Sequence, residues 1–90
     1  MPKGSNNTSG SLTSEQLRAA RALLRWEQRQ LAEASLVSLP TIKRLETRPG
    51  RIAAHAPTIE ALKRALEDAG IEFIPGGTGR GPGVRLKHGS

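Results

Sequence analysis

The sequence contains no cysteine and no tyrosine, and Trp26 and Phe73 are its only bulky aromatic residues. Disulfide bridges and thiolate metal sites are therefore excluded as sources of stability. The absence of cysteine fits a reducing compartment, and we expect a cytoplasmic location. No apolar run is long enough to span a bilayer, and the helical segments lack the aromatic anchors of membrane-surface helices. We therefore expect no membrane contact.

Constellations of catalytic residues are also missing. His55 and His88 stand apart from any clustered acid or nucleophile. The glycine-rich segment 75–83 lacks the Gly-Lys-Ser or Gly-Lys-Thr of a phosphate-binding loop, and its spacing fails the dinucleotide fingerprint. We expect no enzymatic activity, no metal site and no cofactor.

The length of 90 residues allows one small domain. A domain of this size buries only about 60–65% of the surface of its unfolded chain, so helix packing and oligomerisation are the remaining routes to stability. Residues 1–11 are polar and lack the apolar core of a signal peptide, and we expect a disordered tail there. The hydrophobic period changes from about 3.6 to 2 after Gly70, which separates a helical segment, 12–70, from a strand segment, 71–88.

The net charge of +6 is unevenly distributed along the chain. Between Arg18 and Arg51, eight basic residues against three acidic ones give +5. A local basic surface attracts polyanions and accelerates encounter with them. The alternative interpretation is an ordinary solvated face of charged helices.

The helical segment begins and ends with recognisable capping signals. Thr13 and Gln16 have the spacing of a capping box, and helical periodicity continues from there to Leu24. A further helix opens at Ala56, and Gly70 is well placed as its C-terminal cap.

Two short helices joined by a tight turn lie between these ends. They are expected at about residues 28–34 and 39–47, with the turn at 35–38. Ser38 is placed to cap the second of them, and Pro40 lies in its first turn. This is the pattern of a DNA-binding helix-turn-helix, whose second helix lies in the major groove.

One charged residue interrupts the apolar stripe of the first helix. Arg21 follows Leu17 and Ala20 at helical spacing and precedes Leu24. An unpaired charge in that stripe is costly. We therefore predict a carboxylate partner for Arg21 in the folded chain.

The strand segment predicts two short strands, 71–74 and 84–87, joined by a mobile glycine-rich connection. An isolated hairpin is marginal in water and exposes strand edges. We therefore expect these strands to join the same segment of a second chain across a two-fold axis. The alternative is a hairpin that packs on the last helix of its own chain. The expected dimerisation face consists of Ile71, Phe73, Val84 and Leu86.

Four motifs together resemble the XRE family of helix-turn-helix regulators, which includes the lambdoid phage repressors and Cro. They are Leu17-Arg-Ala-Ala-Arg21, Gln28-x-x-Leu-Ala32, Val37-Ser-x-x-Thr-Ile-x-x-Leu-Glu46, and Ile59-x-x-Leu62 with Leu66. The resemblance covers about residues 12–70. It implies a mainly α, lambda-repressor-like four-helix domain, here followed by a C-terminal two-stranded β element in place of the family's usual fifth helix.

The resemblance also implies roles for individual residues. Arg21 matches an arginine that forms a buried ion pair with the glutamate at the position of Glu46. Arg44 is the best candidate for reading a guanine edge, with a phosphate contact as the equal alternative. The matched DNA-binding positions are Gln28, Ser38, Leu39, Pro40, Thr41 and Arg44. Lys43, Arg48 and Arg51 are added as expected phosphate contacts on their charge, with an uninvolved surface charge as the equal alternative for each.

Two positions depart from the family pattern. Leu36 occupies a turn position that is usually glycine, and a left-handed leucine there costs roughly 1–2 kcal/mol. Glu27 stands where the family usually has a serine, threonine or asparagine cap.

The sequence thus predicts a homodimeric transcriptional regulator, most simply a repressor, that binds double-stranded DNA. One alternative is the antitoxin of a toxin–antitoxin pair, which also represses its own promoter and has the toxin as a protein partner. The other is a helix-turn-helix module that binds protein instead of DNA.

Overall fold

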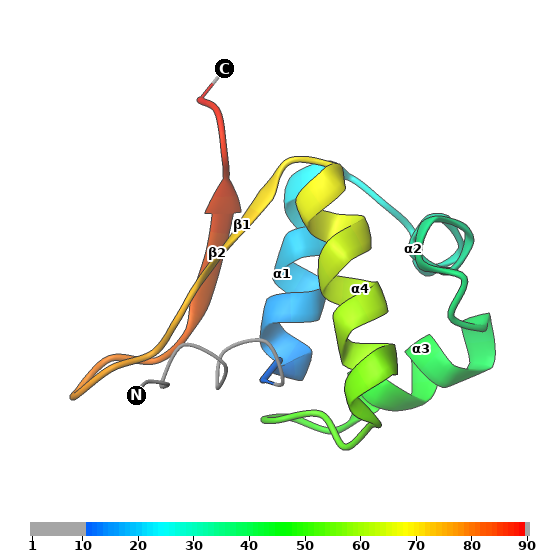
Figure 1. The fold of residues 1–90 in the computed structure, drawn as a ribbon, viewed down its shortest axis with the longest axis horizontal. Coiled ribbons are helices and arrows are strands. Elements are labelled where there is room, and N and C mark those ends of the chain that lie inside the picture. The colour runs from blue at the N-terminus through cyan, green and yellow to red at the C-terminus, as the bar shows by residue number, and fades with distance from the viewer. Residues whose placement is uncertain (1–10, 90) are drawn as a thin grey trace.

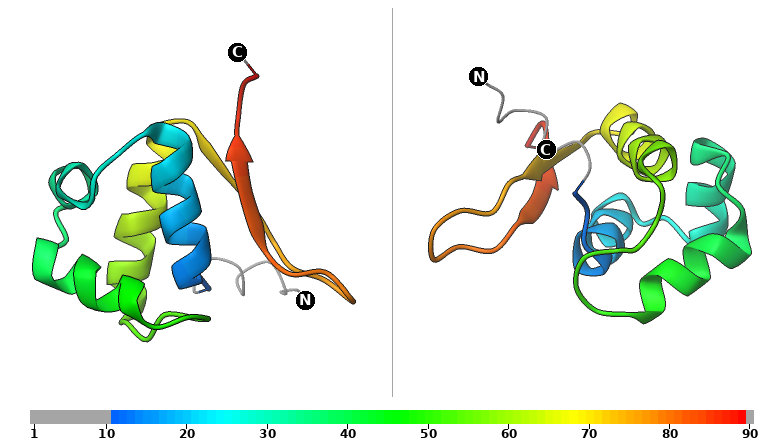
Figure 2. Two further views of the ribbon diagram at one scale, coloured as in Figure 1. Left: turned by 180° about the vertical axis from the view of Figure 1, so that it is seen from behind. Right: turned by 60° about the horizontal axis from the view of Figure 1, so that its bottom comes forward.

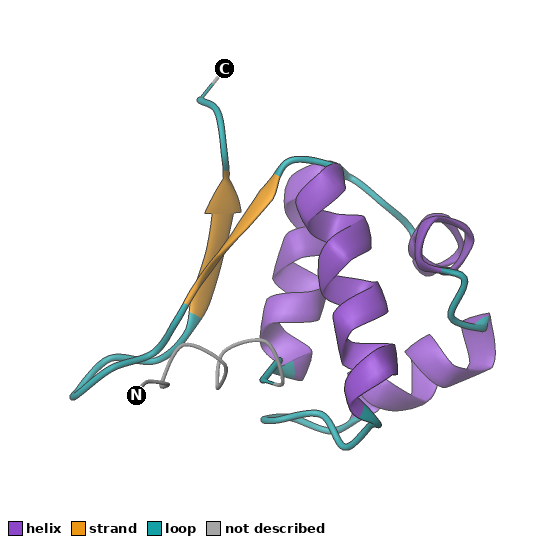
Figure 3. Cartoon of the chain, viewed as in Figure 1, coloured by secondary structure: helices purple, strands orange, loops and turns teal. Residues whose placement is uncertain are grey.

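The computed structural model describes residues 11–89. The predicted tail, 1–11, therefore lies outside the described residues except for Ser11. Four helices precede a two-stranded antiparallel sheet, so the described chain is mainly helical with a C-terminal β pair (Figures 1 and 3). The elements are α1 (Ser14–Leu24), α2 (Gln28–Ser35), α3 (Leu39–Thr47), α4 (Ala56–Asp68), β1 (Ile71–Ile74) and β2 (Gly83–Leu86).

Local capping explains where the helices begin. The Thr13 hydroxyl accepts a hydrogen bond from the Gln16 N–H at 3.0 Å, and Gln16 Oε1 accepts one from the Thr13 N–H at 3.0 Å. This reciprocal pair is the predicted capping box of α1. At α3, Ser38 Oγ accepts from the Thr41 N–H at 3.3 Å. Both helix starts are therefore determined by residues next to them in the sequence.

The helices and the hairpin enclose one apolar core. α2 packs against α3 and α4, and α3 also packs against α1. The hairpin adds a further layer, with β2 against α1 and β1 against α4 (Figure 2). The buried apolar residues are Leu12, Leu17, Ala20, Leu31, Ile42, Leu45, Ile52, Ile59, Leu62, Ala65, Leu66 and Ile71.

The two strands pair with each other within the chain and pack on its own helices. Ile71 lies opposite Leu86 and Phe73 opposite Val84. Ile71 is fully buried, and Phe73 and Val84 pack against the core. The expected dimerisation face is therefore largely occupied by intramolecular packing, because the apolar side of the hairpin covers α1 and α4. Leu86 alone among its four residues is substantially exposed, at 40%.

The glycine-rich connection leaves residues 75–76 and 81–82 unpaired and ends in a tight turn closed by one isolated bridge. Gly77 and Arg80 keep the register of the strands and exchange two backbone hydrogen bonds of 2.8 and 3.0 Å. Thr78 and Gly79 close the turn, and Gly79 has a φ of +72°. The second strand begins at Gly83, one residue earlier than predicted.

Candidate nucleic-acid interface

Helix α3 has one buried and one exposed side. Ile42, Leu45 and Glu46 are buried against the rest of the molecule. The opposite side is open to solvent: Pro40, Lys43, Arg44 and Thr47 are exposed, and Leu39 and Thr41 are half-buried. The amphipathic spacing of the sequence is therefore realised in the fold, with the polar side available for a partner.

The exposed side of α3 carries unpaired positive charge. Lys43 and Arg44 lie on the helix, and Arg48 follows its last turn. None of the three forms an ion pair with any residue between 11 and 89. Arg44 and Thr41 also line a hollow together with His55 and residues near the start of α4. Cations that are not neutralised by neighbouring carboxylates remain free to bind an anionic partner.

An internal ion pair holds the C-terminal half of α3 in place. Arg21 Nε donates to Glu46 Oε2 at 2.8 Å, and Arg21 Nη2 donates to Glu46 Oε1 at 2.7 Å. The Glu46 side chain is only 5% exposed, and the Arg21 side chain 18%. Arg21 Nη1 also donates to the Trp26 carbonyl at 2.9 Å, which links the pair to the connection between α1 and α2. The predicted carboxylate partner of Arg21 is thus Glu46.

Gln28 belongs to this same cluster. Its Nε2 donates to Glu46 Oε1 at 2.9 Å, and the residue is half-buried at the start of α2. The amide nitrogen of Gln28 is thus directed into the protein, and the DNA contact expected of Gln28 stays a prediction. Its role in the structure is to join α2 to the ion pair between α1 and α3.

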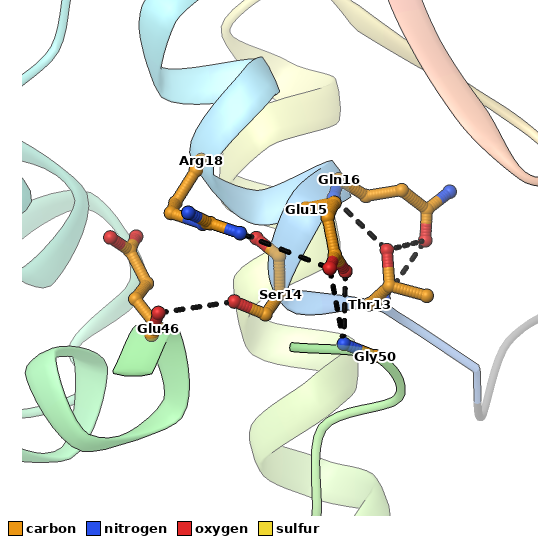
Figure 4. A network of polar contacts seen from close by, with 7 residues as sticks. All are labelled: Thr13, Ser14, Glu15, Gln16, Arg18, Glu46 and Gly50. Atoms are coloured by element: carbon orange, nitrogen blue, oxygen red, sulfur yellow. Dashed lines mark hydrogen bonds and ion pairs between the residues drawn. The ribbon is translucent and has the colours of Figure 1, made fainter. Parts of the chain in front are cut away.

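A second set of contacts connects the start of α1 to the end of α3 (Figure 4). Ser14 Oγ donates to the Glu46 carbonyl at 3.2 Å. The Glu15 carboxylate accepts from the Gly50 N–H, with oxygen distances of 3.0 and 3.2 Å. The backbone N–H groups of Glu15 itself and of Gly50 lower the pKa of this carboxyl. Sequence patterns do not reveal these contacts, because their partners are more than 30 residues apart.

Arg51 lies in a different environment from the α3 cations. It forms an isolated β-bridge with Thr13 and lines a hollow of about 480 Å³ between the start of α1, α4 and the hairpin. Lys63 and Phe73 line the same hollow, and the Lys63 ammonium lies 5.2 Å from the centre of the Phe73 ring. Arg51 was expected among the DNA-binding residues on charge alone, and its location groups it with the hairpin side.

Among residues 11–89, two non-glycine residues adopt left-handed backbone conformations at helix ends. Leu36, with a φ of +63°, ends α2 and is 90% exposed in the turn before α3. The left-handed conformation expected at Leu36 is therefore present. Arg25 ends α1 with a φ of +58°. Nothing in the sequence distinguishes Arg25, since arginine has no preference for this conformation.

Comparison with known proteins adds no identification. The chain matches no protein-family model, no curated protein and no solved structure. Residues 11–89 contain no group of three or more histidine, cysteine or acidic side chains arranged to hold a metal ion. None of the helices described is both long and apolar enough to cross a membrane. The geometry of α3 and its supports is therefore the basis for a functional proposal.

Proposed function

We propose that the chain is a helix-turn-helix regulator that binds double-stranded DNA, with α3 in the major groove. The major groove is about 12 Å wide and admits one α-helix. The observation that carries this proposal is the exposed basic side of α3 on a helix fixed from behind by the Arg21–Glu46 pair. A rigid helix presents its side chains to base edges with little loss of conformational entropy.

The proposed contacts follow from the exposure and chemistry of the side chains on α3. Arg44 is the candidate base reader, because its guanidinium matches the O6 and N7 atoms of guanine. Lys43 and Arg48 are candidates for phosphate contacts on either side of the groove. Leu39 and Pro40 lack hydrogen-bonding side chains, so their contribution is steric or a contact with a thymine methyl group.

A homodimer that represses by occupying a promoter is part of the proposal. Each strand of the hairpin has one edge that is unpaired among the described residues, and Leu86 is a partly exposed apolar residue there. Strand edges of this kind are sites where a second chain can add. A two-fold dimer would present two copies of α3 about one DNA turn, roughly 34 Å, apart and would favour a palindromic site.

Selection of bound duplexes from random DNA, followed by affinity measurements at several salt concentrations, tests the proposal. We expect wild-type affinity to fall steeply with salt, because each neutralised phosphate releases counterions. Arg44→Ala should remove the preference at one base pair, whereas Lys43→Ala should weaken all sequences alike. The matched control is Arg64→Ala, which removes the same charge from the exposed side of α4. Failure to enrich any sequence, together with salt-independent or absent DNA binding, would overturn the proposal.

A protein partner for the same face is the competing function that one observation favours. Leu36 is 90% exposed in the turn that precedes α3, so a protein bound to this face would meet its apolar side chain. Under this alternative, Leu36→Ser abolishes partner binding, and DNA affinity is weak and unselective. The salt titration therefore distinguishes the two functions.

A further inference from the structure

We propose that the end of the hairpin is a second DNA-binding element, in which Arg80 contacts the duplex outside the segment covered by α3. This proposal rests on the proposed function, because it assigns a further contact to the same DNA complex. We refer to residues 75–82, which connect β1 and β2, as the arm.

The arm projects away from the helices. All of its residues are exposed. The ribbon views show its turn well outside the helical body from each direction (Figures 1 and 2). Its tip is closed by the Gly77–Arg80 bridge, which lies in the same register as β1 and β2, although residues 75–76 and 81–82 between the bridge and the strands are unpaired. Its base is attached to α1 by the hydrogen bond from Gln16 Nε2 to the Gly83 carbonyl, at 3.0 Å.

The chemistry of the arm favours a nucleic acid over a protein partner. Arg80 is its only charged residue, and the guanidinium forms no ion pair with any residue in the described part of the chain. The other arm residues are glycine, proline and Thr78, so the arm offers little apolar area to a protein surface. Arginine is the side chain that most often binds phosphates in a forked geometry and enters narrow minor grooves. A single arginine on a narrow two-stranded arm is therefore suited to contact the phosphates or the minor groove of a duplex.

The position of the arm relative to α3 allows both to meet one straight duplex. In Figure 1 the turn of the arm, the loop after α3 and α3 itself lie along the lower side of the molecule. The arm and α3 lie toward opposite ends of the longest dimension, which is 37 Å. One turn of B-DNA is about 34 Å long. A duplex along this side would therefore meet α3 at one end and Arg80 within about one turn of it.

The test compares Arg80→Ala on two duplexes that share the same selected core. The short duplex, of roughly 12 base pairs, holds one half-site of that core and covers only the segment bound by one copy of α3, and the long duplex extends the same half-site by about one turn on each side. We expect Arg80→Ala to weaken binding to the long duplex by about fivefold to tenfold and to reduce its salt slope by about 1, with no change on the short duplex. Arg80→Lys should keep the salt slope, because it retains the charge, and Arg64→Ala serves as the charge-matched control.

The outcomes separate this proposal from the proposed function. If wild-type chain prefers a DNA sequence and Arg44→Ala impairs it, but Arg80→Ala is indistinguishable from wild type on the long duplex, the arm proposal fails and the α3 proposal stands. Equal weakening on both duplexes places the effect of Arg80 inside the core and also overturns the arm proposal. If wild-type chain binds neither duplex above non-specific affinity, both proposals fail.

Discussion

Arg21 of α1 and Glu46 of α3 meet through two parallel hydrogen bonds, with N–O distances of 2.8 and 2.7 Å. The forked guanidinium matches the two carboxylate oxygens, which makes this the strongest type of side-chain pair. Gln28 of α2 donates to the same carboxylate at 2.9 Å. One buried glutamate thus fixes the relative orientation of three helices, including the helix whose outer side we assign to DNA.

We expect Arg21→Met to lower the free energy of unfolding by about 3–5 kcal/mol, because it leaves Glu46 charged, buried and short of its main partner. Urea unfolding followed by circular dichroism measures this change. Arg85→Met is the control, because it breaks the exposed Glu72–Arg85 pair, where solvent screens the interaction, and its effect should be far smaller.

The double variant Arg21→Met with Glu46→Leu tests whether the loss comes from the unpaired charge. Replacing both partners by apolar residues of similar size should recover most of the stability. If the double variant is no more stable than Arg21→Met, the loss reflects packing and the argument from buried charge is wrong.

Leu36→Gly should raise the stability by about 1 kcal/mol. A left-handed backbone at leucine costs roughly 1–2 kcal/mol of conformational free energy. At glycine this cost is much smaller, although glycine loses more backbone entropy on folding. The side chain is 90% exposed, so its removal forfeits little packing. The melting temperature should rise by roughly 4–8 °C. Leu36→Ala is the matched control, because it removes the exposed side chain but keeps the strained backbone; an equal gain in both variants would contradict the backbone explanation.

Much of the helical part of the fold was predictable, because it depends on local signals. The capping box at Thr13 and the cap at Ser38 define helix starts within a few residues of themselves. The need for a carboxylate near Arg21 followed from its place in an apolar stripe, and the resemblance supplied Glu46. The bounds of α3 agree with the expected 39–47 for the same reasons.

The rest depends on contacts between distant residues. The packing of α2 on α3 decides whether the Gln28 amide faces solvent or Glu46. Hydrophobic periodicity along the sequence does not reveal how two helices pack. The intramolecular burial of Ile71 likewise depends on how the hairpin folds back onto the helices. The arm was expected as a mobile connection because glycine and proline usually mark loops. Those same residues permit its tight turn, since Gly79 has a positive φ.

Acid should weaken the attachment between α1 and the loop after α3. The Glu15 pKa is lowered in the folded chain from an ordinary value of 4.5 by the backbone N–H groups of Glu15 and Gly50. A carboxyl whose pKa is lower in the folded state stabilises the fold above its unfolded pKa, and this stability is lost as the pH falls through the folded pKa. Glu15→Gln should therefore be less stable than wild type at neutral pH, with the difference shrinking below about pH 4.

Unfolding measurements across this pH range, on wild type and Glu15→Gln, check the prediction. Glu72 has a pKa lowered by its hydrogen bond to Arg85 and by the charge of Arg85, so part of the acid sensitivity should remain in the Glu15 variant. A stability difference between the two proteins that does not depend on pH would show that the Glu15–Gly50 contact is not the cause.

The oligomeric state should depend on Leu86. If the hairpin edge joins a second copy, Leu86→Lys introduces a charge at a partly exposed apolar position of β2 and opposes the association. Light scattering on the full chain should then give a dimer for wild type and a monomer for the variant, with unchanged circular dichroism.

Truncation after Gly70 is unsuitable, because it removes Ile71 and Phe73 from the core. Leu23→Lys is the control, since Leu23 is 42% exposed on α1, outside the strands. A Leu86→Lys variant that remains dimeric would place the interface elsewhere, and a monomeric wild type would remove the dimer from the proposal.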